Sequence, residues 1–202
     1  MAKTWRIGTV GILFLLAASV GEAQETDDRP VLRVHVENHA EVPTSILRLA
    51  ELELTHLYDA AGVRVLRSTR RDHADCLRTL TIHVILLSPG MEDRLDRGQG
   101  RAPNVLGRAS REALRAYVYW SRVKDYVSSV IVSPGDALGF IMAHEVGHIL
   151  LPSGGHSTTG IMQENYLVHS MYTLRFNPDQ AAAIRAFVLV GKQAAANPLE
   201  PR

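Results

Sequence analysis

The sequence predicts an α+β fold, in which one domain holds a twisted mixed β-sheet of about five strands, an N-terminal helix, a long helix in the second half and a C-terminal helix. Two observations predict this class. Apolar runs of strand length recur along the chain, and helix-length segments with capping residues follow them. No internal repeat or break in composition marks a second domain, so residues 24–202 are expected to form a single domain with an ordered core over 30–192.

The first half predicts a strand, a helix and two further strands. Residues 31–36 alternate apolar and polar side chains, which is typical of a half-buried strand. The apolar spacing over 44–61 fits an amphipathic helix that ends at Gly62. Strands are expected at 63–66 and 80–87, and the nearly continuous apolar run of the second favours the centre of the sheet.

The next segment predicts a loop and a hairpin. Prolines, glycines and charges are frequent over 88–104, which indicates a long surface loop. Residues 105–110 and 114–120 are the expected strands of the hairpin, joined by a short turn.

Two capped helices follow. Ser133 and Pro134 supply a capping side chain and a first-turn proline, so a helix is expected from there to about Leu151. Asn177 is the expected cap of a last amphipathic helix that continues to about Val190.

Residues 1–23 have the features of a secretory signal peptide. Lys3 and Arg6 precede an apolar run over 7–20, and a small-x-small pattern ends at Ala23, the expected cleavage site. The run is shorter than the roughly 20 residues of a membrane span. We therefore expect a secreted or periplasmic protein without stable membrane association after signal cleavage.

The charge balance argues against nucleic acid as a partner. The chain has 22 Lys and Arg against 21 Asp and Glu, and cleavage after Ala23 removes two of the former and one of the latter, which leaves no net charge. A nucleic-acid surface would be strongly basic. We expect a monomer that takes a peptide or protein substrate. The single cysteine, Cys76, cannot form an internal disulfide and is expected to be a small buried side chain.

Residues 144–148 read His-Glu-Val-Gly-His within the predicted long helix. Residues four apart share a helix face, so the imidazoles of His144 and His148 can bind one zinc ion, Zn2+. Glu145 is not needed as a ligand and can reach a metal-held water from the flank of the same helix. It is the expected general base.

A catalytic zinc site needs a third protein ligand. His156 is the expected residue, because Pro152 and the glycines after it end the helix and can turn the chain back. Glu164 and His169 remain alternatives. His83 is expected to be a core histidine with a satisfied hydrogen bond, and no metal role is expected for the other isolated histidines, His35, His39, His56 and His73.

The order His-Glu-x-x-His, a turn, a third histidine and then Gly-Ile-Met at 160–162 resembles the metzincin group of zinc endopeptidases. The resemblance implies a zincin-like fold over 31–190, with zinc on the three histidines, Glu145 polarising the attacking water and Met162 beneath the metal. It also implies that an extended substrate lies along an edge strand within 105–110. Two positions depart from the pattern: Leu151 replaces the usual glycine, and the third histidine falls at 156 instead of 154.

These features predict a secreted zinc-dependent endopeptidase that hydrolyses peptide bonds through a zinc-bound water, with Glu145 as general base. One alternative is a catalytically silent zinc-binding interaction module. Such a module needs only the metal ligands, so the presence of Glu145 argues against it. Another is a zinc hydrolase of a non-peptide amide or a cell-wall substrate. Tyr166 is a possible donor to the oxyanion, but an ordinary half-buried tyrosine is the simpler expectation.

Overall fold

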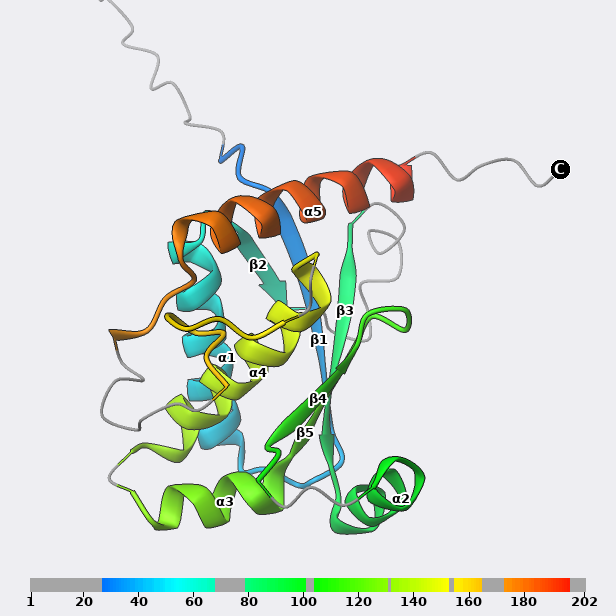
Figure 1. Cartoon of the computed structure of the whole chain (residues 1–202), viewed down its shortest axis with the longest axis vertical. Helices are drawn as coiled ribbons and strands as arrows, with labels where there is room; N and C mark the ends of the chain where they lie inside the picture. The colour runs from blue at the N-terminus through cyan, green and yellow to red at the C-terminus, as the bar shows by residue number, and fades with distance from the viewer. Residues whose placement is uncertain are drawn as a thin grey trace, which may run out of the picture.

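The computed structural model describes residues 27–67, 79–100, 104–130, 132–152, 155–164 and 173–196 (Figure 1). Within these ranges the strands are β1 (Val31–Asn38), β2 (Arg64–Arg67), β3 (Thr81–Leu87), β4 (Gly107–Ser110) and β5 (Arg115–Tyr119). The helices are α1 (Thr44–Ala60), α2 (Pro89–Gln99), α3 (Trp120–Ser128), α4 (Pro134–Leu150) and α5 (Pro178–Ala196). The α+β class and the mixed five-stranded sheet are confirmed.

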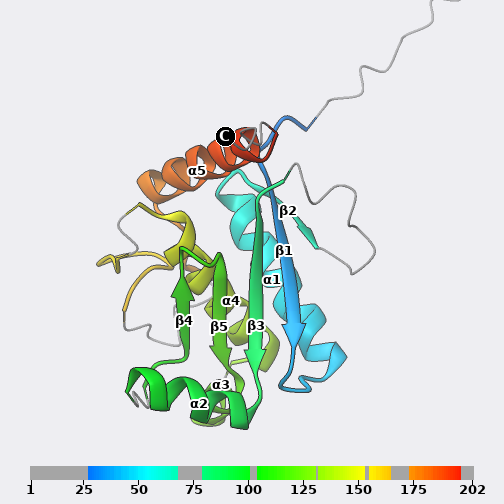
Figure 2. The same ribbon diagram turned by 90° about the vertical axis from the view of Figure 1, so that its right-hand side faces the viewer.

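The sheet has the order β2-β1-β3-β5-β4, so β3 lies at its centre as the apolar run predicts. The β1–β2, β1–β3 and β3–β5 pairs are parallel, and β4 pairs antiparallel with β5. Figure 2 shows the strands side by side with β4 at one edge. The predicted hairpin is confirmed, and its outer strand is an edge of the sheet.

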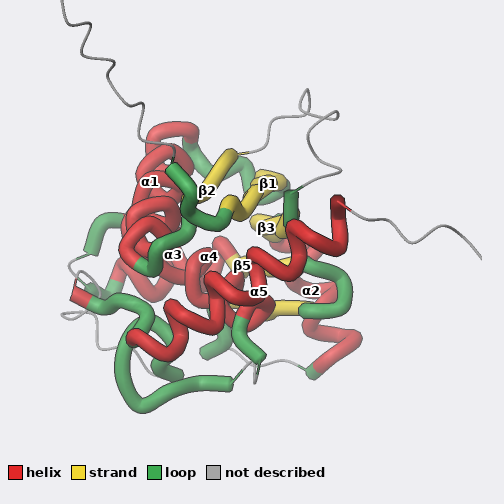
Figure 3. Tube along the Cα trace, turned by 90° about the horizontal axis from the view of Figure 1, so that it is seen from above, coloured by secondary structure: helices red, strands yellow, loops and turns green. Residues whose placement is uncertain are grey.

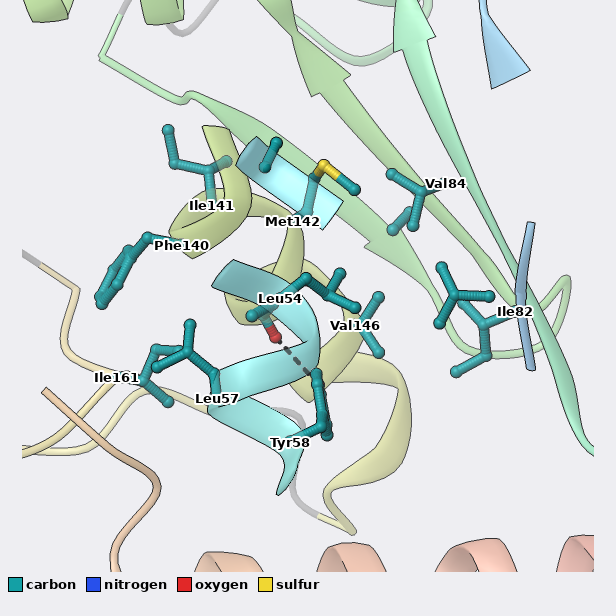
Figure 4. Close-up of a cluster of buried hydrophobic side chains, with 14 of the residues drawn as sticks. Leu54, Leu57, Tyr58, Ile82, Val84, Phe140, Ile141, Met142, Val146 and Ile161 are labelled. Carbon is teal, nitrogen blue, oxygen red and sulfur yellow. Dashed lines mark hydrogen bonds between the residues drawn. The ribbon is translucent and has the colours of Figure 1, made fainter. Parts of the chain in front are cut away.

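Helices cover the two faces of the sheet unequally. α1 and α4 lie on one face and enclose the main core, part of which is drawn in Figure 4. α2 covers a part of the other face, where Met91 and Leu95 pack on Ile85, Leu87 and Tyr119. α5 contacts β1 and α4, and it lies in front of the other elements in the view from above (Figure 3).

The long helix α4 begins as its sequence predicts. Ser133 is the N-cap, its hydroxyl accepts a hydrogen bond from the Asp136 amide, and Pro134 occupies the first turn. Most α4 residues are buried, including those of the turn before His144. A helix that is apolar on nearly every side belongs inside the molecule. The chain therefore buries most of the His-Glu-Val-Gly-His segment and leaves His148 partly exposed.

Close contact with α1 fixes the position of α4. A Cβ on Gly139 would lie 2.5 Å from the Ala50 carbonyl oxygen, and one on Gly135 would lie 2.5 Å from Leu49 Cβ. The buried Tyr58 hydroxyl donates a 3.0 Å hydrogen bond to the Ala143 carbonyl, the dashed line in Figure 4. The two helices thus approach at backbone distance beside the histidine motif.

The structure corrects several sequence-based expectations. Residues 89–99 are helix α2, so the prediction of a long surface loop over 88–104 is wrong. Helix α3 was not expected, and α5 extends beyond Val190 to Ala196. No helix in the described ranges has the length and apolar character needed to cross a membrane.

His83 is the remaining correction. It lies on β3 as expected, but its side chain is 41% exposed and its Nδ1 is 3.1 Å from Glu37 Oε1. Because its side chain points away from the main core, the prediction of a core histidine is wrong. The alternation along β3 explains the difference, since Ile82 and Val84 take the core-facing positions on either side.

Candidate metal centre

One ring nitrogen of His144 is hydrogen-bonded to the backbone, and this bond fixes the orientation of the ring. Its side chain is buried, and Nδ1 donates a 2.8 Å hydrogen bond to the Ile161 carbonyl oxygen. A carbonyl can only accept, so the proton is on Nδ1 and Nε2 is left as the metal-binding nitrogen. Burial lowers the pKa of His144 to about 4, which keeps the ring neutral, as a metal ligand must be.

The three predicted histidines meet at one point. The Nε2 atoms of His144 and His148 are 2.9 Å apart. The His156 ring centroid is 5.4 Å from that of His144 and 5.0 Å from that of His148. One ring nitrogen from each residue lies within 4.8 Å of the others. Zinc–nitrogen bonds of 2.0–2.1 Å in a tetrahedron put ligands about 3.3 Å apart, so small side-chain adjustments fit one ion.

A short return loop brings His156 to α4. The helix ends at Leu150 with Leu151 as its C-cap, and farther along the Ser157 amide donates a 2.8 Å hydrogen bond to the Met162 carbonyl. Gly160 has a φ of +79°, and a Cβ there would lie 2.5 Å from the Arg175 carbonyl oxygen. Glycine is required at this turn both for its backbone angle and for space. The loop is thus built locally by 157–162.

Met162 is buried against the helix between the two histidines. A Cβ on Gly147 would lie 2.6 Å from Met162 Sδ and 3.2 Å from Phe176. Met162 itself is 0% exposed. The methionine therefore lies against the α4 turn that spaces His144 from His148. Its role beneath a metal stays a prediction.

Glu145 is buried beside the edge strand β4. Its side chain is 5% exposed, and it packs against Gly107, where a Cβ would lie 2.6 Å from Oε1. Burial raises the pKa of Glu145 to about 8, and the Arg108 charge partly opposes this rise. A carboxyl group whose pKa is near neutrality can both take and return a proton. Gly107 was not singled out in the sequence, although a glycine inside a predicted strand was an available signal.

Of the two alternative third ligands, the structure describes only Glu164. Glu164 is exposed and is not part of the three-histidine cluster that the described residues form. His169, Tyr166, Cys76, His73 and the predicted signal peptide lie outside the described residues. The second cluster of metal-binding side chains, His35, Glu37 and His83, was not expected.

The chain is similar to a zinc-dependent peptidase from Methanocorpusculum labreanum, with 14% sequence identity and a TM-score of 0.48 over 76% of this chain and 99% of that one. It is also similar to the archaemetzincin of Methanopyrus kandleri, with 14% identity and a TM-score of 0.45 over 83% of this chain and 99% of that one. No protein-family model matches the chain. No curated protein matches it in sequence.

Proposed function

We propose that this chain is a zinc-dependent endopeptidase with His144, His148 and His156 as metal ligands and Glu145 as general base. The observation that carries the proposal is the convergence of three imidazoles, two of them with Nε2 atoms 2.9 Å apart, beside a buried carboxyl group. Neutral imidazoles are ligands that zinc accepts readily. Three histidine ligands alone would be compatible with a structural zinc site. The buried Glu145 next to them favours a catalytic site, because a structural site needs no general base.

The residues have separate tasks in this proposal. The histidines hold the ion, and His144 is oriented by its bond to the Ile161 carbonyl. Zinc in such a site lowers the pKa of a water molecule to about 7 and polarises a carbonyl group. Glu145 takes a proton from the attacking water and passes it to the leaving amine. Burial of Glu145 among α4 and β4 keeps competing solvent away from its carboxyl group.

The edge strand β4 offers a place for the peptide. β4 pairs with β5 on one side and is last in the strand order. An extended peptide can pair with the outer side of such a strand through backbone hydrogen bonds, independently of its sequence. Because Gly107 of β4 contacts Glu145, a peptide bound there would lie near the proposed base.

Replacing Glu145 with Gln tests the catalytic part. Gln keeps the shape of the side chain but cannot take a proton, so Glu145→Gln should bind zinc at wild-type stoichiometry and lose at least about 100-fold in peptide cleavage. The exposed Glu112 supplies a matched control, and Glu112→Gln should cleave normally. A library of unmodified peptides is the substrate. Wild-type protein that binds zinc but cleaves no library peptide would contradict the peptidase proposal and favour the interaction module or a non-peptide substrate.

Ligand substitutions test the metal part. His156→Ala should weaken zinc binding far more than His169→Ala, as measured by zinc retention during dialysis against a chelator. The reverse order would assign the third position to His169. Loss of a ligand from a three-histidine site leaves two, which is too few for stable catalytic zinc.

We also propose that the chain is exported and processed after Ala23, and that the mature protein is a monomer. The basic start, apolar run and small-x-small pattern of 1–23 support export. Mass spectrometry of the mature protein from cell fractions measures the cleavage site, and sedimentation measures the oligomeric state. An intact N-terminus in the exported fraction would contradict the processing proposal.

A further inference from the structure

A second group of metal-binding side chains lies on the face of the sheet opposite α4. His35 and Glu37 are two residues apart on β1, so they project from the same face. His83 on β3 is the parallel cross-strand partner of His35. Figure 2 views this face, and α2 lies across its lower end. The three side chains thus share one face, on which each is partly exposed.

Their geometry is that of a compact ligand set. His83 Nδ1 and Glu37 Oε1 are 3.1 Å apart. The rings of His35 and His83 have centroids 5.3 Å apart and meet edge to face. One ligand atom from each of the three residues lies within 4.8 Å of the other two. The distance between His83 and Glu37 is close to the roughly 3.3 Å that separates ligands of a tetrahedral zinc ion, and a small side-chain adjustment would bring His35 to the same ion.

We propose that His35, Glu37 and His83 form a second divalent-metal site, which takes zinc or a similar transition-metal ion. Two imidazoles and one carboxylate are a donor set that such ions prefer, and the partial exposure of the side chains leaves the fourth position to water. This site is independent of the proposed peptidase centre, because no residue is shared and the sheet separates the two.

His39 positions the carboxylate of this second site. Its Nε2 is 3.3 Å from Glu37 Oε2, the oxygen that does not face His83. The carboxyl group of Glu37 is thus held between the two histidines, with Oε1 directed to His83 and Oε2 to His39.

Two arginines near the sheet site should lower its affinity for a metal ion. Arg33 precedes His35 by two residues on β1, and Arg115 is the β5 partner of His83, so both occupy neighbouring positions on this face. Positive charge near a cation site weakens binding. Arg115 is exposed, and its long side chain can extend its charge into water. We expect weaker binding here than at the three histidines of α4.

Zinc chloride titration of chelator-treated protein tests the proposal by counting bound ions. Wild-type protein should bind two zinc ions per chain. The double variant His35→Ala/His83→Ala should bind one, and so should the double variant His144→Ala/His148→Ala. The variant with all four substitutions should bind none. Because each double variant keeps one site, failure at the sheet site and failure at the α4 site give different results. Far-UV circular dichroism checks that each variant is folded.

Affinity measurements sharpen the test. Glu37→Gln keeps the side-chain shape but loses the charge, so zinc affinity at the sheet site should fall at least about 10-fold, and His39→Ala should weaken it less. His56 supplies the control, because it is an exposed histidine beside Glu53 that belongs to no three-ligand cluster of the described residues, and His56→Ala should change nothing. The proposal is overturned if His144→Ala/His148→Ala binds no zinc, or if His35→Ala/His83→Ala binds as many ions as wild type.

Discussion

Gly107 in β4 packs directly against the side chain of Glu145 in α4. A Cβ at residue 107 would lie 2.5 Å from Glu145 Cγ and 2.7 Å from Cδ, closer than a carbon atom can approach without movement. The carboxyl group therefore has its place because this strand position lacks a side chain. The position of the proposed general base therefore depends on the residue at position 107 of the edge strand.

Gly107→Ala should reduce peptide cleavage while leaving zinc bound. The added methyl group must push the Glu145 carboxyl aside, and a displacement of about 1 Å at a reacting group costs on the order of 100-fold in rate. Kinetic constants and zinc content measured on the same preparation check this expectation. Gly98→Ala is the matched control, because a Cβ there meets nothing within 4 Å. Equal activities of the two variants would count against the role given to Gly107.

The stability of the metal-free protein should depend on pH through two groups that act in opposite directions. Burial raises the pKa of Glu145 from 4.5 to about 8, so the folded chain keeps a proton that the unfolded chain releases, and stability falls as pH rises between these values. Burial lowers the pKa of His144 from 6.5 to about 4, so stability rises with pH over that interval. Below pH 6.5 the two effects oppose each other.

Between pH 6.5 and 8 only Glu145, and not His144, makes the stability depend on pH. The free energy of unfolding of the metal-free protein should fall there, by at most about 1.4 kcal/mol per pH unit. Glu145→Gln should remove this slope, so the difference between the two proteins isolates the carboxyl group. Urea unfolding with a chelator present, at several pH values, measures it. Parallel pH profiles would show that Glu145 is ionised in the folded metal-free chain.

Gly147→Ala should destabilise the protein, against the usual preference for alanine in helices. Alanine ordinarily gains about 1 kcal/mol over glycine in a helix. Here its Cβ would lie 2.6 Å from Met162 Sδ, and overpacking typically costs about 1–3 kcal/mol. Met162→Ala makes room, so the double variant should be less destabilised than the two single changes summed, by more than about 0.5 kcal/mol. Strict additivity in urea unfolding would contradict this contact.

Removal of metal should leave the protein folded. The core of α1, α4 and the sheet is built from apolar side chains that do not involve the three histidines, unlike a small zinc domain that depends on its ion. Bound zinc at 1,000 times its dissociation constant would add about 4 kcal/mol to stability. A chelator should therefore lower the melting temperature without abolishing cooperative unfolding, which scanning calorimetry would detect. Loss of the transition would mean that the metal organises the core.

The sequence predicted correctly those features that depend only on residues near one another in the chain. The Ser133 cap, the apolar content of α4 and the four-residue spacing of His144 and His148 are all local, and the structure contains the helix and brings these rings together. The same holds for the Asn177 cap, whose Oδ1 accepts a hydrogen bond from the Gln180 amide at 2.9 Å.

Helix α2 was missed because its first residues are ambiguous. Pro89 and Gly90 are frequent in turns, yet proline is equally suited to the first turn of a helix, where its lack of an amide hydrogen is harmless. The signal that favoured a helix was the four-residue spacing of Met91 and Leu95, whose side chains pack on the second apolar cluster. Charged residues between them hid this pattern.

The second histidine cluster depends on pairing between distant strands. His35 and Glu37 share a face by their spacing alone, but only the register of β1 and β3 places His83 beside them. Register is decided by which apolar faces are buried together, and a single segment does not carry that information. The sequence therefore presented these histidines as isolated.

The hydrogen bond from Tyr58 to the Ala143 carbonyl gives this protein a built-in optical reporter. The phenol is immobilised in an asymmetric apolar environment and is bonded to the peptide group just before His144. Such fixed aromatic rings produce the near-ultraviolet dichroism of folded proteins. Binding of an ion at α4 is therefore expected to change the near-ultraviolet dichroism of Tyr58, because its hydroxyl is hydrogen-bonded to the residue next to His144.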